Sequence, residues 1–110
     1  LVGSEMCIET EVFIGTPHIA GYSADGKANA TRMSLDSLCR HFGIQADYHI
    51  DPPKPENPTI IASTPTEAYL KMYDPRKDCE ALRAHPELFE KLRGDYPLRR
   101  EKTAFSVASP

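Results

Sequence analysis

The chain of 110 residues contains few cysteines, no long apolar run and no excess of positive charge. The three cysteines, Cys7, Cys39 and Cys79, are odd in number and far apart, with no Cys-x-x-Cys pair. This spacing argues against both a disulfide framework and a zinc site, so we expect no metal centre. Free cysteines are typical of a reducing compartment, and we therefore expect a cytoplasmic protein.

Two further absences narrow the class of protein. No stretch approaches the roughly 18 consecutive apolar residues that span a bilayer, and no basic start with an apolar core marks a signal peptide. The net charge of −3 argues against a nucleic-acid surface, which usually needs a concentrated basic patch. We therefore expect neither a membrane nor a nucleic acid as partner. The length is that of one ordinary domain.

Residues 1–10 look foreign to the rest of the chain. They resemble the translation of a sequencing-library adapter, and position 1 is not Met. We therefore expect them to be a non-native segment that takes no part in the fold, like an expression scar. We expect the natural chain to extend upstream of Glu11.

A single titratable imidazole, His18, stands on a short loop after the β-prone run Val12–Thr16, which is predicted to be a buried strand. Pro17 fixes its own φ and biases the residue before it toward extended backbone. Gly21 permits close approach of a backbone or a ligand. A strand end, a loop and a following helix form the setting in which open α/β sheets bind ligands.

A long helix is predicted from Ser23 or Asp25 to about Phe42, with Gly43 at the position that ends it. Mostly apolar residues recur at three- and four-residue spacing along one face, which should be buried in the complete protein. They are Ala28, Thr31, Leu35, Leu38, Cys39 and Phe42.

A proline-rich segment divides the chain. Four prolines within residues 51–58 exclude a helix or a central strand, so residues 44–58 are interpreted as an extended linker. Short strands are predicted beyond it, at residues 59–62 and 103–107.

Three helices are predicted between these strands. Thr64, Pro65 and Glu67 form a capping box with the favoured first-turn proline. A second helix is expected over Asp78–Ala84, capped by its first residue, and a third over Pro86–Gly94. The expected core of this half comprises Leu70, Met72, Leu82, Leu88, Phe89, Leu92 and Phe105.

Charges near the end of the chain, in the segment Arg99–Glu101, are interpreted as solvated, with an inter-subunit ion pair as the alternative. Lys27, near the start of the long helix, is likewise expected to face solvent. Cys79 is expected to pack within its helix.

Two separated stretches resemble a known family. The first carries His18-Ile19-Ala20-Gly21-Tyr22-Ser23 followed by Asp25-Gly26-Lys27. With its flanks, over residues 12–43, it resembles the last strand, catalytic loop and long return helix of the D-2-hydroxyacid dehydrogenases. The second lies in residues 73–101 and is similar to a C-terminal dimerisation domain peculiar to one branch of that family.

The resemblance implies an α/β fold in two parts. Residues 11–43 would be the C-terminal remnant of a Rossmann-type NAD-binding domain. The linker 44–58 would lead to a small α+β dimerisation domain over residues 59–110.

The resemblance also implies NAD-dependent oxidation of a small phosphorylated 2-hydroxy acid by a homodimer, with NAD as cofactor. Matched by position, His18 is the catalytic acid/base, Gly21 contacts NAD through its backbone, and Tyr22 contacts the substrate. An imidazole with an ordinary pKa of about 6.5 can accept the substrate hydroxyl proton near neutral pH. A tyrosine hydroxyl can hydrogen-bond a carboxylate or a phosphate.

Much of that family's machinery has no counterpart here. No Gly-x-Gly-x-x-Gly motif is present, and no residue matches the family's catalytic arginine or glutamate, so the chain alone is expected to be inactive. Two alternatives stay open: another D-2-hydroxyacid dehydrogenase, such as one acting on phosphoglycerate, and a non-catalytic oligomerisation module. Tyr22 and the stretch 76–101 argue against the first alternative.

Overall fold

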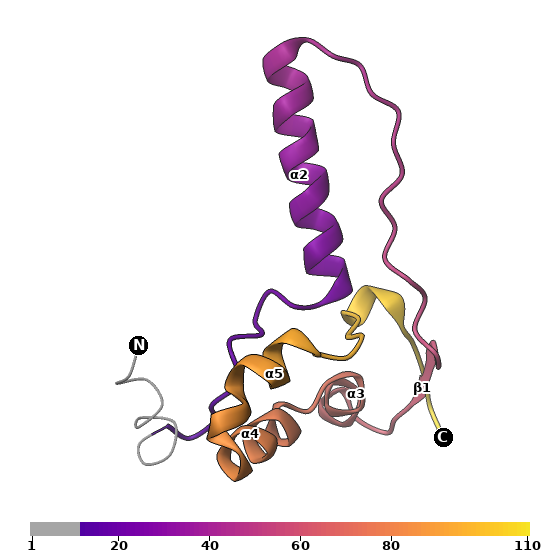
Figure 1. Ribbon diagram of the computed structural model, residues 1–110. Coiled ribbons are helices and arrows are strands. Elements are labelled where there is room, and N and C mark those ends of the chain that lie inside the picture. Colours follow the sequence, from indigo (N-terminus) through magenta and orange to yellow (C-terminus); the bar gives the residue numbers. More distant parts are fainter. Residues whose placement is uncertain (1–11) are drawn as a thin grey trace.

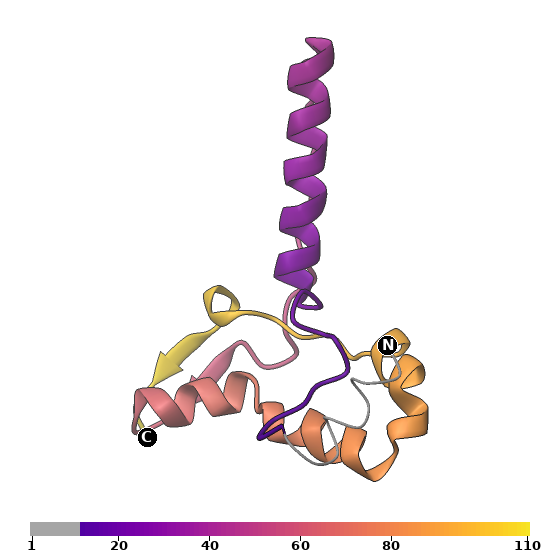
Figure 2. The ribbon, with the colours of Figure 1, turned by 90° about the vertical axis from the view of Figure 1, so that its left-hand side faces the viewer.

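The computed structural model describes residues 12–110, so the interpretation of residues 1–10 lies outside the described part. The elements follow the order α2 (Ala24–Phe42), β1 (Thr59–Ile61), α3 (Pro65–Met72), α4 (Pro75–Ala84), the 3₁₀ helix η1 (Pro86–Leu88), α5 (Phe89–Gly94), the 3₁₀ helix η2 (Lys102–Ala104) and β2 (Ser106–Ala108). Figures 1 and 2 show α2 standing away from a group formed by the shorter elements. The α/β class is confirmed.

Helix α2 is capped by Ser23, one of the two caps that the sequence offered, and ends at Gly43 as predicted. The Ser23 hydroxyl caps it by accepting a hydrogen bond from the Gly26 amide at 2.9 Å. At the other end Gly43 adopts a φ of 64°, and its amide donates to the Cys39 carbonyl. This is the left-handed backbone that glycine adopts at least cost.

The apolar face of α2 is largely uncovered. Leu38 is 55% exposed and Phe42 is 62% exposed, and Figure 2 shows the helix projecting clear of the other helices. The extended segment 44–58 returns alongside it toward β1 (Figure 1). Within residues 12–110 this face therefore lacks the partner that its pattern predicts.

The strand predicted for Val12–Thr16 is wrong, because this segment has no regular structure. Its backbone groups are bound by side chains of α4: the Arg83 guanidinium donates to the carbonyls of Val12 and Phe13, and the Gly15 amide donates to Cys79 Sγ at 3.4 Å. A strand needs a neighbouring strand to satisfy its backbone, and none lies beside this segment in the described part of the chain.

The strands β1 and β2 form a parallel pair, with Ile60 opposite Val107 in the register. They are parallel because the helices between them return the chain to the same end of the sheet. The prediction for residues 103–107 was partly wrong, since η2 occupies 102–104 and the strand covers 106–108.

The core against this sheet is small. Ile60, Ala62 and Ala68 are buried, and Met72 and Phe105 pack on them. Of the seven predicted core residues, Leu82 is fully buried at 1% exposure, whereas Leu70 and Leu88 are exposed at 40% and 36%. Two of the three buried residues are alanines, whose small side chains let β1 and α3 pack close together.

The helix starts in this half depend on local caps. At α3 the Thr64 hydroxyl accepts from the Glu67 amide, as predicted, and Glu67 Oε2 accepts from the Ser63 amide. Helix α4 begins three residues earlier than predicted. Its cap is Asp74, because this residue precedes a proline suited to the first helical position.

None of the helices within residues 12–110 combines the length and apolar character needed to cross a membrane.

Candidate functional site

His18 lies on the surface in a strained backbone conformation. Its φ is 56°, and among the described residues no other non-glycine residue has a positive φ. Left-handed backbone costs a residue with a β-carbon about 1 kcal/mol, though histidine tolerates it better than most. The loop is fixed on both sides, since Pro17 and Ile19 are almost fully buried. The imidazole is therefore presented to solvent by a firmly held turn.

Gly21 completes this turn without needing to be a glycine. Its φ is not in the left-handed region, and no atom lies within 4 Å of the point that a β-carbon would occupy. The turn itself is closed by the Tyr22 amide, which donates to the Ile19 carbonyl at 3.0 Å. The close approach predicted at Gly21 is therefore not made by any described residue of the chain.

Tyr22 is half-buried and surrounded by cations. The Lys27 ammonium lies 4.5 Å from its ring centroid and the Arg93 guanidinium carbon 5.4 Å from it. The ring also packs edge-on against Tyr96 at 6.3 Å. Among residues 12–110 the Tyr22 hydroxyl has no hydrogen-bond partner, and the nearby positive charges favour an anionic group beside it.

Arg99 binds the turn directly behind His18. Its guanidinium donates from Nη2 to the carbonyl of Ile19 at 2.9 Å and to that of Ala20 at 3.2 Å. Its own carbonyl accepts from the Ala24 amide at 2.8 Å, where α2 begins. Side chain and backbone of one residue thus hold the loop at two points.

Arg100 and Glu101 bind the first turn of α2. Arg100 donates from Nε and Nη2 to the two carboxylate oxygens of Asp25, at 2.9 and 3.0 Å. The Glu101 amide also donates to Asp25, and the Ser23 hydroxyl donates to Glu101 Oε1 at 2.6 Å. The hydrogen-bonded Arg100 guanidinium lowers the pKa of Asp25 below its ordinary value.

The prediction of solvated charge for the segment Arg99–Glu101 is therefore wrong. The side chains of Arg100 and Asp25 are only 11% and 12% exposed, and the ion pair lies within one chain. Two positions 75 residues apart carry no spacing signal that could pair them in advance. The one sequence hint was that both segments belong to the stretches that resemble the dehydrogenase family.

A second, partly buried hydrogen-bond network lies against the Arg99 side chain. The hydroxyls of Tyr73 and Tyr96 both donate to Asp78 Oδ2 at 2.8 Å. Burial, followed by the contact with Asp78, raises the pKa of both tyrosines, so they stay protonated donors. The Arg99 guanidinium carbon lies 4.6 Å from the centroid of the Tyr73 ring and 5.5 Å from that of Tyr96.

An open cavity of about 580 Å³ lies between the loop and the C-terminal segment. Ile19 and Ala20 line it, but His18, Gly21 and Tyr22 do not. The other residues around it come from the segment before His18, from α3 to the start of α4, and from the last part of the chain: Ile14, Thr16, Tyr69, Met72, Tyr73, Pro75, Arg99, Arg100, Glu101 and Lys102.

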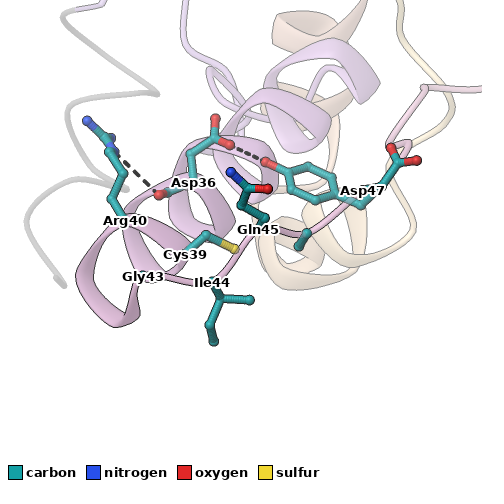
Figure 3. A pocket seen from close by; sticks show the side chains of 9 residues that line it. Asp36, Cys39, Arg40, Gly43, Ile44, Gln45 and Asp47 are labelled. Atoms are coloured by element: carbon teal, nitrogen blue, oxygen red, sulfur yellow. Dashed lines mark hydrogen bonds between the residues drawn. The ribbon is translucent and has the colours of Figure 1, made fainter.

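A different cavity, of about 970 Å³, lies at the far end of α2 (Figure 3). Its walls include Cys39, Gly43 and the side chains of Asp36 and Tyr48, which hydrogen-bond to each other. None of the predicted site residues lines it. We therefore centre the candidate site on the His18 loop.

The described residues do not by themselves make up a dinucleotide site. The space over Gly21 is open, which suits a flat group lying against the backbone. The glycine-rich turn that binds the pyrophosphate has no counterpart in the sequence. Residues 12–110 contain no group of three or more potential metal ligands.

Comparison with known proteins gives a consistent result. No protein-family model matches the chain. Curated relatives do: it is 65% identical over 97 residues to the erythronate-4-phosphate dehydrogenases of Bacteroides fragilis and Bacteroides thetaiotaomicron. It is 43% identical over 101 residues to the protein of that name from Porphyromonas gingivalis. The first of these alignments covers 88% of the chain but only 28% of the relative, so the chain spans little more than a quarter of that protein's length.

Proposed function

Because the chain is homologous to a segment of the erythronate-4-phosphate dehydrogenases, we propose that it is part of an NAD-dependent enzyme of this kind. The reaction is oxidation of 4-phospho-D-erythronate at C2 to (R)-3-hydroxy-2-oxo-4-phosphooxybutanoate, a step in pyridoxine 5′-phosphate biosynthesis. The observation that carries the proposal is the identity of 65% over 97 residues.

In this proposal His18 is the acid/base. When bound, NAD supplies the acceptor for the hydride that leaves C2. The imidazole accepts the proton of the C2 hydroxyl and returns one in the reverse direction. The surface position of His18, on a turn fixed by its buried neighbours, supports this role.

Tyr22 binds the substrate in this proposal. Its hydroxyl donates a hydrogen bond to a carboxylate or phosphate oxygen. Lys27 and Arg93, which flank its ring, add the positive charge that a phosphorylated acid requires. Gly21 leaves room for the cofactor to lie against the backbone.

The chain by itself is inactive under this proposal, because it carries neither the phosphate-binding turn nor the arginine that would hold the substrate carboxylate. The whole protein is a cytoplasmic homodimer joined through residues 59–110. The exposed apolar side chains of Ile61 and Val107, 56% and 53% exposed on the two strands, support an interface there.

The experiment that tests the proposal starts from the gene. Reading the DNA upstream of Glu11 distinguishes the enzyme, which requires an open frame encoding a glycine-rich turn, from a non-catalytic oligomerisation module, which requires a start codon. The complete gene product is then assayed for NADH formation with 4-phosphoerythronate and with other 2-hydroxy acids, phosphoglycerate included. A lack of preference for the phosphorylated four-carbon acid contradicts the proposed specificity.

A further inference from the structure

We infer that Arg99 is a positioning residue for the proposed reaction: by binding the carbonyls of Ile19 and Ala20, it holds the left-handed backbone of His18 that aims the imidazole. The inference rests on the proposed role of His18 as the acid/base. Arg99, which is distant from His18 in the sequence, would thereby take part in the proposed reaction.

Arg99 binds the backbone directly after His18, the residue with the strained φ. His18 has a φ of 56°, and the two carbonyls that follow it accept from a single guanidinium nitrogen at 2.9 and 3.2 Å. Strained backbone persists only when its surroundings over-determine it. Nη2 carries two N–H donors, one for each carbonyl, and the planar guanidinium holds them in a fixed orientation while it stacks on a ring. The ammonium of a lysine has no such plane.

Arg99 is itself held in a fixed position. Its guanidinium lies over Tyr73 and Tyr96, and both ring hydroxyls are bound to half-buried Asp78. Its carbonyl accepts from the Ala24 amide. A residue held through both its side chain and its backbone can transmit a defined geometry to the loop it touches.

Arg100, in contrast, acts on the helix. Its guanidinium binds Asp25 in the first turn of α2 and the Pro53 carbonyl, and it makes no hydrogen bond to the backbone of residues 18–20. The two adjacent arginines should therefore be separable. Loss of the Arg100 side chain should lower stability, whereas loss of the Arg99 side chain should lower the rate of the chemical step.

The test uses the full-length protein with Arg99→Lys and Arg99→Ala. The matched control is Arg76→Lys, because Arg76 is 61% exposed and, among the described residues, its ion pair is with Asp74 near its own helix start. Misplacing a catalytic group by about 1 Å costs on the order of a hundredfold in rate. We expect kcat to fall about ten- to a hundredfold in both Arg99 variants, with KM for NAD unchanged and with the control matching the wild type.

Chemical rescue separates positioning from folding. Guanidinium ion at non-denaturing concentration should restore kcat in Arg99→Ala, whereas methylammonium should not. If Arg99→Ala does not fold, Arg99→Lys carries the test through kcat and thermal midpoint. A wild-type kcat in the Arg99 variants, or a loss that follows only the thermal midpoint and is not rescued, overturns the inference.

The two proposals fail in different ways. An inactive wild-type protein overturns the proposed function and the inference with it. An active wild-type protein that loses activity in His18→Asn, but keeps it in both Arg99 variants, overturns the inference alone.

Discussion

Arg100 and Asp25 form a two-point ion pair across 75 positions of sequence, with nitrogen–oxygen distances of 2.9 and 3.0 Å. The pair connects the end of the chain to the first turn of α2, directly after the loop that carries His18. Asp25 also accepts from the Glu101 amide, so its carboxylate is fully engaged. The start of the long helix and the C-terminal segment therefore form one structural unit.

The first prediction concerns acid stability. Arg100 lowers the pKa of Asp25, so the pair contributes its full stabilisation above the pKa of an unfolded aspartate, about 3.9. That contribution is lost as the pH falls through the folded pKa. Asp25→Asn should lower the free energy of unfolding by about 2 kcal/mol at neutral pH and should flatten its decline in acid.

Urea unfolding of the full-length protein over a pH series measures this effect. The control is Asp51→Asn, since Asp51 is exposed in the linker. An Asp25→Asn variant with the same acid slope as the wild type would show that the ion pair does not control stability.

The second prediction concerns His18. Asparagine tolerates left-handed backbone at least as well as histidine, so His18→Asn should leave the thermal midpoint unchanged. In the full-length protein it should lower kcat by about a hundred- to ten-thousandfold, the usual contribution of a general acid or base. Circular-dichroism melting and steady-state assays, both on the full-length protein, check the two parts, and retention of turnover would refute the proposed role.

The third prediction compares two glycines. Gly21 has open space around it and no left-handed φ, whereas Gly43 has a φ of 64°. Gly43→Ala should therefore destabilise the fold by about 1 kcal/mol, and Gly21→Ala should not. If NAD lies against Gly21 in the full-length protein, Gly21→Ala should instead raise KM for NAD. An unchanged KM would remove Gly21 from the proposed cofactor site.

The fourth prediction concerns the chain in isolation. Phe13 is 92% exposed and Phe42 is 62% exposed, so the apolar surface should bind a hydrophobic dye and favour aggregation. Phe42→Ser combined with Leu38→Ser should reduce both effects. Dye fluorescence and size-exclusion chromatography provide the measurement, and a monomeric, cooperatively melting wild-type chain would contradict this prediction.

The sequence alone predicted the elements that depend on neighbouring residues. The Gly43 end of α2 was predictable, and the sequence limited its cap to Ser23 or Asp25, because capping groups lie within a few residues of the bonds they satisfy. The capping box at Thr64 follows the same rule. The extended segment 51–58 also followed directly, because proline restricts its own φ wherever it occurs.

The tertiary structure decided the contacts between distant segments. The sequence suggested a strand at Val12–Thr16, but Arg83 and Cys79 bind its backbone instead. It also placed His18 on a loop, yet gave no sign that Arg99 would bind that loop from 79 to 80 positions away. Sequence rules for caps and turns involve residues a few positions apart. Contacts between residues that are remote in the sequence depend on how the whole chain folds, and so only the tertiary structure shows them.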